Sequence, residues 1–288
     1  MKGHRVVRRF GWDCHGLPVE AEMEKTIGVS GHSRIIEYGV GKFNEECRSI
    51  VLRYTSEWKK AITRTGRWVD FENGYRTMDK SYMESVWWVF KTLYEKGLIY
   101  EGYNVLPYSP KLASPLSNME VSLGGYKDVV DQAVTVRFKI DGTENSYFLA
   151  WTTTPWTLPS NLALAVGPEI EYVEVEDEAD GAHYYLASNL LGKYWKDGKG
   201  CRILRTVKGN DLVGMTYEPL FPYFASLKEK GAFQVVTADY VTVEDGCGIV
   251  HTASGFGEDD YNTMKAKVPG CPVVCPVDEE CRFTSEVP

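Results

Sequence analysis

Hydroxyl side chains crowd one short stretch of the chain, from Trp151 to Asn161. Four threonines fall within six residues and an asparagine amide follows them: Thr152, Thr153, Thr154, Thr157 and Asn161. Pro155 and Pro159 disfavour a regular helix or a central strand there, because each lacks an N–H and restricts φ. Such a rigid, polar segment suits a pocket that binds a polar ligand through hydrogen bonds. The alternative is a strand end with threonines on its exposed face.

A second stretch, 246–261, reads as a strand, a glycine-rich loop and the start of a helix. Gly255 and Gly257 allow close backbone approach or a positive φ in that loop. The first helical turn is acidic, where the helix dipole favours negative charge: Glu258, Asp259 and Asp260. His251, a hydroxyl-rich loop and Asp260 therefore fall within ten residues. The alternative is a capped and solvated helix start.

Together the two stretches resemble the editing domain of the isoleucyl-tRNA synthetase family, class I enzymes that charge tRNA with isoleucine. The family carries a T-T-T-P-W-T-L-P-x-N segment and a G-x-G-x-V-H-x-A-x-G-x-G-x-D-D-Y segment, and this chain matches both in order. Ser254 stands where many relatives have proline. Two long motifs about ninety residues apart are far more specific than an isolated glycine motif. The resemblance covers nearly the whole chain, and its first part looks closest to eukaryotic cytoplasmic enzymes.

The resemblance implies a role for each site residue. Asp260 is expected to bind the α-ammonium group of a misattached valine through a charge-assisted hydrogen bond. His251 is expected to form the wall that excludes the longer isoleucine side chain. The terminal ribose, the ester carbonyl and the attacking water are expected to be held by Thr152, Thr153, Thr154 and Asn161. Two further residues of the first motif are expected to contact substrate: Trp156 and Thr157.

The expected reaction is hydrolysis of Val-tRNA(Ile). A hydrophobic pocket distinguishes one methylene by only about 1–3 kcal/mol, a limit for which isoleucyl-tRNA synthetase is itself the usual illustration. No Ser-His-Asp set is apparent, so we expect direct attack by a positioned water, assisted by the substrate's ribose hydroxyl. His251 as general base is the alternative. Other readings are a non-catalytic module that binds aminoacyl-tRNA ends and an unrelated β-rich hydrolase.

The first part of the chain resembles the end of the first half of a class I catalytic core. Residues 10–18 read as a strand and a turn, followed by a helix that starts near Pro18 and stops at Gly28. Within the resemblance, G-W-D-x-H-G-L-P-x-E implies that Asp13 holds the substrate's α-amino group. His15 favours isoleucyl over leucyl enzymes, which usually have Phe there. A buried turn with Trp12 and His15 in the core is the alternative.

Helical periodicity predicts two long helices in this part. The first spans 41–65 with one apolar face: Phe43, Cys47, Ile50, Val51, Tyr54, Trp58 and Ile62. The second is capped by Asp79, stops at Gly97 and buries a stripe made of Met83, Val86, Phe90, Leu93 and Tyr94. A strand is expected at 99–108.

Shorter, alternating runs follow from residue 131 onward. Strands are expected at 133–140, 146–151, 171–176, 184–187, 201–207, 234–236 and 247–252, with helices at 223–230 and after Gly257. We therefore predict an α/β chain with two domains. Residues 1–120 form a partial nucleotide-binding, Rossmann-type core with helices, and residues 121–288 form a β-barrel-like editing (CP1) domain with a few helices.

Composition limits the partners. Residues 1–125 carry 18 basic and 15 acidic side chains (net +3), and residues 126–288 carry 14 and 25 (net −11). An acidic second part is a poor general nucleic-acid surface, so any RNA is expected to meet it only through a short end. The resemblance implies that this end is the acceptor end of tRNA(Ile), and no DNA partner is expected. A basic run could touch tRNA phosphates or form a solvated strand pair: Lys193, Lys196, Lys199, Arg202, Arg205 and Lys208. No apolar run is long enough to span a bilayer, so no membrane partner is expected.

Seven scattered cysteines and the lack of a secretory signal fit free thiols in a reducing, cytoplasmic compartment. The spacing of Cys271, Cys275 and Cys281 lacks a C-x-x-C pair, so no metal site is predicted. Neither an H-I-G-H-type nor a K-M-S-K-S-type motif occurs. ATP and Mg²⁺ are therefore expected to serve only the parent synthetase. Editing is expected to need no cofactor, and this chain is expected not to form an aminoacyl-adenylate.

Overall fold

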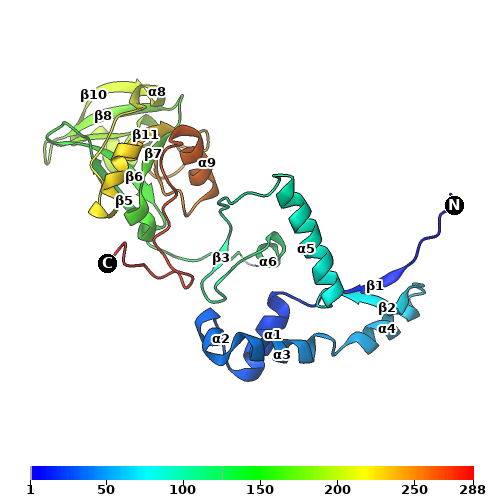
Figure 1. The fold of residues 1–288 in the computed structure, drawn as a ribbon. Coiled ribbons are helices and arrows are strands. Elements are labelled where there is room, and N and C mark those ends of the chain that lie inside the picture. Colours follow the sequence, from blue (N-terminus) through cyan, green and yellow to red (C-terminus); the bar gives the residue numbers. More distant parts are fainter. Residues whose placement is uncertain (1, 125) are drawn as a thin grey trace. The chain divides into compact units, whose positions relative to one another are not determined.

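The computed structural model describes residues 2–124 and 126–288, leaving aside the side chain of residue 197, and mixes helices with strands (Figure 1). The chain divides into two compact units, Met1–Tyr103 with Ser109–Ser114 and Asn104–Tyr108 with Pro115–Pro288. The division falls within a segment rich in proline and serine, where stiff connections are expected. The functional labels given above to residues 1–120 and 121–288 remain predictions.

The first unit is built on two parallel strands joined through helices. Strand β1 (Arg9–Trp12) pairs with β2 (Asp70–Arg76). Between and after them lie α1 (Leu17–Ile27), α2 (His32–Tyr38), α3 (Val40–Val51), α4 (Thr55–Arg64) and α5 (Lys80–Glu95). Pro18 stands in the first turn of α1, and Gly28 closes that helix at φ 72°, which favours glycine. These features confirm the predicted strand, turn and first helix.

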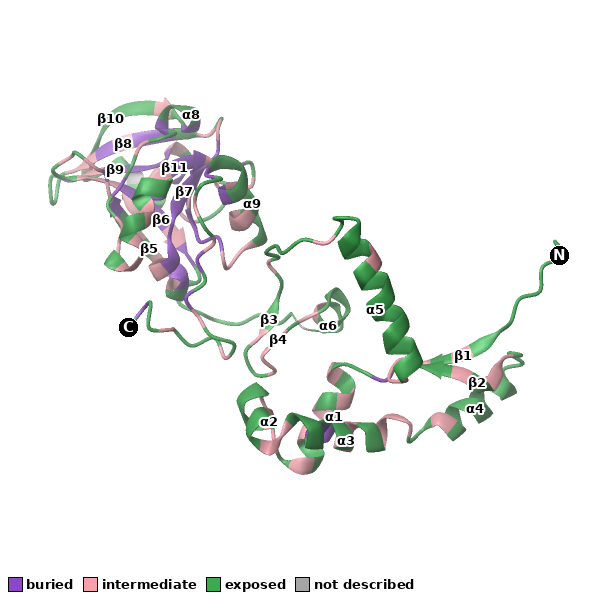
Figure 2. Cartoon of the chain, viewed as in Figure 1, coloured by how far each residue is buried: buried purple, intermediate pink, exposed green. Residues whose placement is uncertain are grey.

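Three sequence predictions for residues 41–108 are wrong. The helix expected at 41–65 is two helices, because the chain leaves helical geometry at residues 52–54. The stripe expected to be buried on α5 is exposed, with Met83 40% and Tyr94 65% accessible (Figure 2). Periodicity specifies which face of a helix is apolar, but burial also requires an element that packs on it.

The third error is the strand expected at 99–108. Only β3 (Tyr108–Ser109) forms, paired with β4 (Ser114–Pro115), and α6 (Asn118–Ser122) follows with a capping box between Ser117 and Glu120. The rest of that segment has no ladder partner among the described residues. A strand is stable only when a neighbour satisfies its backbone hydrogen bonds.

The second unit contains one eight-stranded sheet, curled as a half-barrel (Figure 1). Its strands are β5 (Val134–Lys139), β6 (Ser146–Thr152), β7 (Ala163–Val166), β8 (Glu171–Asp177), β9 (His183–Ala187), β10 (Cys201–Lys208), β11 (Gln234–Thr237) and β12 (Ile249–Thr252). The order is β10-β8-β9-β6-β12-β7-β11, with β5 also paired to β6. The predicted α/β class with a barrel-like second part is therefore confirmed.

Short helices connect the strands of this sheet. They are η1 (Pro155–Ser160), η2 (Ser188–Leu190), α7 (Leu191–Tyr194), η3 (Lys196–Gly198), α8 (Gly209–Leu212), η4 (Pro222–Lys230) and α9 (Glu258–Lys267). The core includes the whole of β7, whose four residues are all inaccessible to solvent (Figure 2). None of the helices in the described ranges is long and apolar enough to cross a membrane.

The basic run is mostly paired within its own surface. Arg202 binds Glu176, Arg205 binds Glu174 with Nε 2.5 Å from the carboxylate, and Lys208 donates to the backbone of Glu169. Lys193 contacts Asp245 at 3.1 Å. These contacts favour a solvated strand pair over a phosphate-binding surface.

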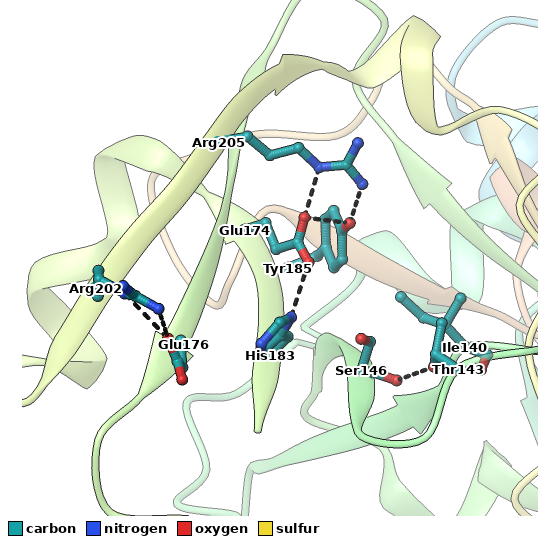
Figure 3. A network of polar contacts seen from close by, with 9 residues as sticks. All are labelled: Ile140, Thr143, Ser146, Glu174, Glu176, His183, Tyr185, Arg202 and Arg205. Carbon is teal, nitrogen blue, oxygen red and sulfur yellow. Dashed lines mark hydrogen bonds and ion pairs between the residues drawn. The ribbon is translucent and has the colours of Figure 1, made fainter. Parts of the chain in front are cut away.

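Glu174 is the centre of a polar network on β8, β9 and β10 (Figure 3). Its carboxylate accepts hydrogen bonds from Tyr185 (2.7 Å) and Arg205 (2.5 Å), and His183 Nδ1 lies 3.1 Å away. The Glu174 side chain is only 12% exposed. Burial alone would raise the pKa of Glu174, but the hydrogen bonds from Tyr185, Arg205 and His183 hold it below its usual value.

Glu174→Ala is expected to lower the free energy of unfolding by about 2–3 kcal/mol, because it removes the acceptor of the buried Tyr185 hydroxyl together with the contacts to Arg205 and His183. Glu176→Ala is the matched control two residues along the same strand. Its partner Arg202 is 70% exposed, so a loss below about 1 kcal/mol is expected. Urea denaturation of the three proteins measures both values, and equal losses would contradict the assigned difference in burial.

Candidate functional site

The pairing of β6 with β12 brings the two motifs together. The strands run parallel, with Val250 opposite Trp151. Both strands therefore end at the same edge, where β6 leads into η1 and β12 leads into the glycine-rich loop and α9. The other edge of β12 pairs with β7, where His251 lies opposite Leu164. Two segments that are far apart in the sequence thus leave the sheet side by side.

A cavity of about 320 Å³ lies at this edge. It is lined by Trp151, Thr152, Thr153, Thr154, Trp156, Thr157, Val250, His251, Ala253, Phe256 and Asp260. Seven of these residues were singled out from the sequence as site residues, and they come from both motifs. The volume is at the lower end of the range usual for small-ligand sites.

His251 is buried at 6% exposure and both of its ring nitrogens have partners. Nδ1 lies 2.8 Å from the Asn161 amide nitrogen, and Nε2 lies 2.9 Å from the Thr157 hydroxyl. Since the amide nitrogen can only donate, Nδ1 accepts and the ring proton is on Nε2. The Thr157 hydroxyl donates to the carbonyl of Thr154 at 2.9 Å, so it accepts from Nε2. The network thus defines a single neutral tautomer.

Burial lowers the pKa of His251 to about 4. Because the ordinary value is about 6.5, the unfolded chain binds a proton between pH 6.5 and 4 that the folded chain excludes. His251 therefore contributes its full stability above pH 6.5, and that contribution is lost as pH falls towards 4.

Between pH 7 and pH 4.5 this one residue is expected to lower the free energy of unfolding by roughly 2–3 kcal/mol. Urea denaturation at a series of pH values measures the slope in wild type and in His251→Gln, which removes the titrating ring. A variant with the same slope as wild type would contradict the assignment. His183→Gln, in which a half-buried histidine of the Glu174 network is replaced, controls for the loss of a different ring.

Asp260 enters the cavity from the first turn of α9. One carboxylate oxygen accepts the backbone N–H of Ala253 at 2.9 Å, and the Tyr240 hydroxyl lies 3.5 Å from the other. Burial raises the pKa of Asp260, although the Ala253 and Tyr240 hydrogen bonds oppose this. Among the described residues, the second oxygen has only this long contact, so it can accept a hydrogen bond from a bound ammonium group.

Thr152, Thr153 and Thr154 contribute a run of hydroxyl groups to the same cavity as Asp260. The Thr152 hydroxyl accepts the backbone N–H of Thr154 at 3.0 Å and lies 3.3 Å from its hydroxyl. Thr152 is buried, whereas Thr153 and Thr154 are exposed and can reach a ligand. Trp156 is 50% exposed and packs edge-on against Phe256, with ring centroids 5.0 Å apart. The two rings contribute an aromatic part of the cavity lining.

Two predicted site residues lie elsewhere. Asn161 is not among the residues that line the cavity; its amide is buried and bound to Ala163, His251 and Tyr217, so it supports His251. Its expected contact with ribose, ester or water stays a prediction. Asp13 belongs to the first unit, is exposed, and accepts a 3.5 Å contact from Thr77. Its expected role is separate from this cavity.

Several residues of the site were missed. Phe256 stands between the two glycines of the second motif, and that position could have indicated it. Tyr240 and Tyr217 carry no local signal, because only the fold brings them to Asp260 and Asn161. Within the described ranges, no group of three or more His, Cys, Asp or Glu side chains could hold a metal ion.

Comparison with known proteins identifies the class. The family model for class I tRNA synthetases (I, L, M and V) matches residues 1–256, and the chain therefore belongs to this family. Isoleucine–tRNA ligase from Treponema denticola is 54% identical over 319 residues, covering 100% of this chain and 29% of that protein. Isoleucine–tRNA ligase from Protochlamydia amoebophila is 56% identical over 289 residues, covering 100% and 28%.

The chain thus spans about three tenths of the length of these relatives. Both are bacterial, so the expected closeness to eukaryotic cytoplasmic enzymes remains a prediction. Among solved structures, the P. knowlesi cytosolic leucyl-tRNA synthetase editing domain gives a TM-score of 0.38 at 13% identity, covering 50% of this chain and 66% of that one.

Proposed function

We propose that the cavity of the second unit is an editing site that hydrolyses Val-tRNA(Ile). The observation that carries the proposal is the convergence of the Asp260 carboxylate, the Thr152–Thr154 segment and a neutral His251 on one cavity of about 320 Å³. A carboxylate, a row of hydroxyls and an uncharged wall match the ammonium, ester and apolar side chain of an aminoacyl ester.

In the proposed complex, Asp260 binds the α-ammonium group of the valyl moiety. Thr153 and Thr154, which are exposed, hold the terminal ribose and the ester carbonyl. A water oxygen attacks the carbonyl carbon, the bond to the ribose oxygen breaks, and that oxygen takes a proton to become a hydroxyl. The products are valine and tRNA(Ile). Positioning and stabilisation of the developing oxyanion supply most of the rate, and no cofactor is required.

His251 serves as a wall in this proposal. Its Nδ1 lone pair is occupied by Asn161 and its Nε2 proton by Thr157, so neither nitrogen is free to take a proton from water. Burial also holds its pKa at about 4, well below the value that suits a base at neutral pH. These contacts favour exclusion of the isoleucyl side chain over general base catalysis.

The wider role follows from the relatives, which are isoleucine–tRNA ligases. We propose that the parent protein joins isoleucine to tRNA(Ile) with ATP and Mg²⁺ in the cytoplasm, and that Asp13 binds the amino group of the amino acid. Because the chain lacks the H-I-G-H-type and K-M-S-K-S-type motifs, it should give no ATP–pyrophosphate exchange above background.

The test is deacylation of pre-formed Val-tRNA(Ile) by the 288-residue chain, with Ile-tRNA(Ile) as the matched substrate control. Faster release of valine than of isoleucine is expected. Release of neither would contradict the proposal. Tight binding of the charged tRNA end without release would support a binding module instead.

A further inference from the structure

The buried hydroxyl of Tyr217 is linked through Asn161 to His251, the proposed wall residue. Tyr217 is fully inaccessible, and its hydroxyl donates to the Asn161 side-chain oxygen at 2.6 Å. Asn161 in turn donates from its amide nitrogen to the Ala163 carbonyl at 2.9 Å and to His251 Nδ1 at 2.8 Å. Tyr217 lies between β10 and β11 in the sequence and does not line the cavity.

The orientation of the Asn161 amide determines whether His251 Nδ1 faces a hydrogen-bond donor or an acceptor. With its oxygen on Tyr217 and its nitrogen on Ala163, the amide presents a donor to Nδ1. A flipped amide would set two carbonyl oxygens against each other at Ala163 and present an acceptor to the ring, which then would need its proton on Nδ1. The Nε2 atom would lose its proton and with it the hydrogen bond that it donates to Thr157.

We infer that Tyr217 is a positioning residue for specificity: through Asn161 it holds His251 in the Nε2–H tautomer and in the orientation that excludes isoleucine. The relay runs from the Tyr217 hydroxyl through Asn161 and His251 to Thr157, whose own proton is committed to the Thr154 carbonyl. Each link has a donor and an acceptor, so no member can reverse without breaking its neighbours' bonds.

This inference rests on the proposed function only for its consequence in catalysis. The tautomer itself is a property of the protein without bound tRNA, and it can be measured in the absence of tRNA. Buried polar networks whose members are all satisfied specify one arrangement, whereas a buried group left without its partner loosens the arrangement.

The experiment uses Tyr217→Phe in the 288-residue chain. Tyr172→Phe is the matched control, because Tyr172 is equally inaccessible and donates its hydroxyl to the Gly248 carbonyl at 2.7 Å, outside the relay. In ¹⁵N-histidine-labelled protein, the two ring nitrogens of His251 resonate far apart in a single tautomer and approach each other when tautomers exchange. Wild type and Tyr172→Phe should show one Nε2–H tautomer, and Tyr217→Phe should show exchange.

The catalytic arm compares deacylation of Val-tRNA(Ile) and Ile-tRNA(Ile). Tyr217→Phe is expected to lower the preference for valine by ~10-fold, the size of one buried hydrogen bond, and Tyr172→Phe is expected to leave it unchanged. Unchanged tautomer and preference in folded Tyr217→Phe would overturn the inference.

An inactive wild type and a Tyr217→Phe variant that does not fold are interpreted separately. If wild type releases neither amino acid, the proposed function fails while the tautomer measurement still decides the relay. If Tyr217→Phe does not fold while Tyr172→Phe does, the wild-type spectrum tests the tautomer on which the inference depends: an Nδ1–H or exchanging ring overturns the inference, and a single Nε2–H ring supports it.

Discussion

Asp260→Ala is expected to reduce kcat/KM for Val-tRNA(Ile) hydrolysis by about 100-fold, the largest loss from any single change in the cavity. The reason is the charge of the proposed ligand group. A hydrogen bond to an ionised partner stabilises by about 1.5–3 kcal/mol, and each 1.4 kcal/mol is a factor of ten. Asp260 is the only carboxylate among the residues that line this cavity in the described part of the chain.

The alanine variant alone would not separate binding from structure, because Asp260 also accepts the Ala253 N–H at 2.9 Å. Asp260→Asn keeps an oxygen for that N–H and removes the charge, so it should lose nearly as much activity as alanine with little change in stability. Asp259→Asn is the matched control on the exposed side of the same helical turn, with activity expected within about 2-fold of wild type. Rates of valine release from pre-formed Val-tRNA(Ile) measure all three. Full activity in Asp260→Asn would show that the carboxylate positions the backbone at Ala253 and does not bind the ligand.

The two halves of this site could each be recognised from sequence because each half carries its own local signal. The threonine run with its two prolines, and the spacing from His251 to Asp260, can both be recognised in the sequence without knowledge of the fold. Their juxtaposition depends on the parallel pairing of β6 with β12, a long-range contact that no local pattern specifies. β7, the strand that flanks β12, was missed, since a four-residue apolar run has too little periodicity to distinguish a strand from a loop.

Tertiary contacts that the sequence does not specify explain two further features. Asn161 has the chemistry of a ligand contact, and in the fold its side chain is bound to Ala163, His251 and Tyr217. The apolar stripe of α5 was recognised correctly as a face and wrongly as buried. In both cases the residue type was informative, whereas the partner of each side chain is a property of tertiary structure.

His251→Ala is expected to relax the selectivity of the cavity for valine over isoleucine. If the ring is a wall, removing it opens space for one more methylene, so hydrolysis of Ile-tRNA(Ile) should rise at least ~10-fold while hydrolysis of Val-tRNA(Ile) continues. If the ring were a base, Val-tRNA(Ile) hydrolysis would fall by about 10²-fold or more and isoleucine would gain nothing. Release of each amino acid from the two charged tRNAs measures the difference directly.

The wall and base predictions remain distinct even though the substitution disturbs the interior. His251→Ala leaves Asn161 and Thr157 without their partner and opens a void, which together cost roughly 2–4 kcal/mol of stability. A loss of both activities in a variant that melts below the assay temperature would report only unfolding, so His251→Gln is the companion. Glutamine fills part of the void and can replace one hydrogen bond, but it cannot act as an imidazole base near neutral pH. If the ring only excludes the isoleucyl side chain, His251→Gln is therefore expected to continue releasing valine. Glutamine can occupy the same space as the ring, but it cannot take up a proton as imidazole does.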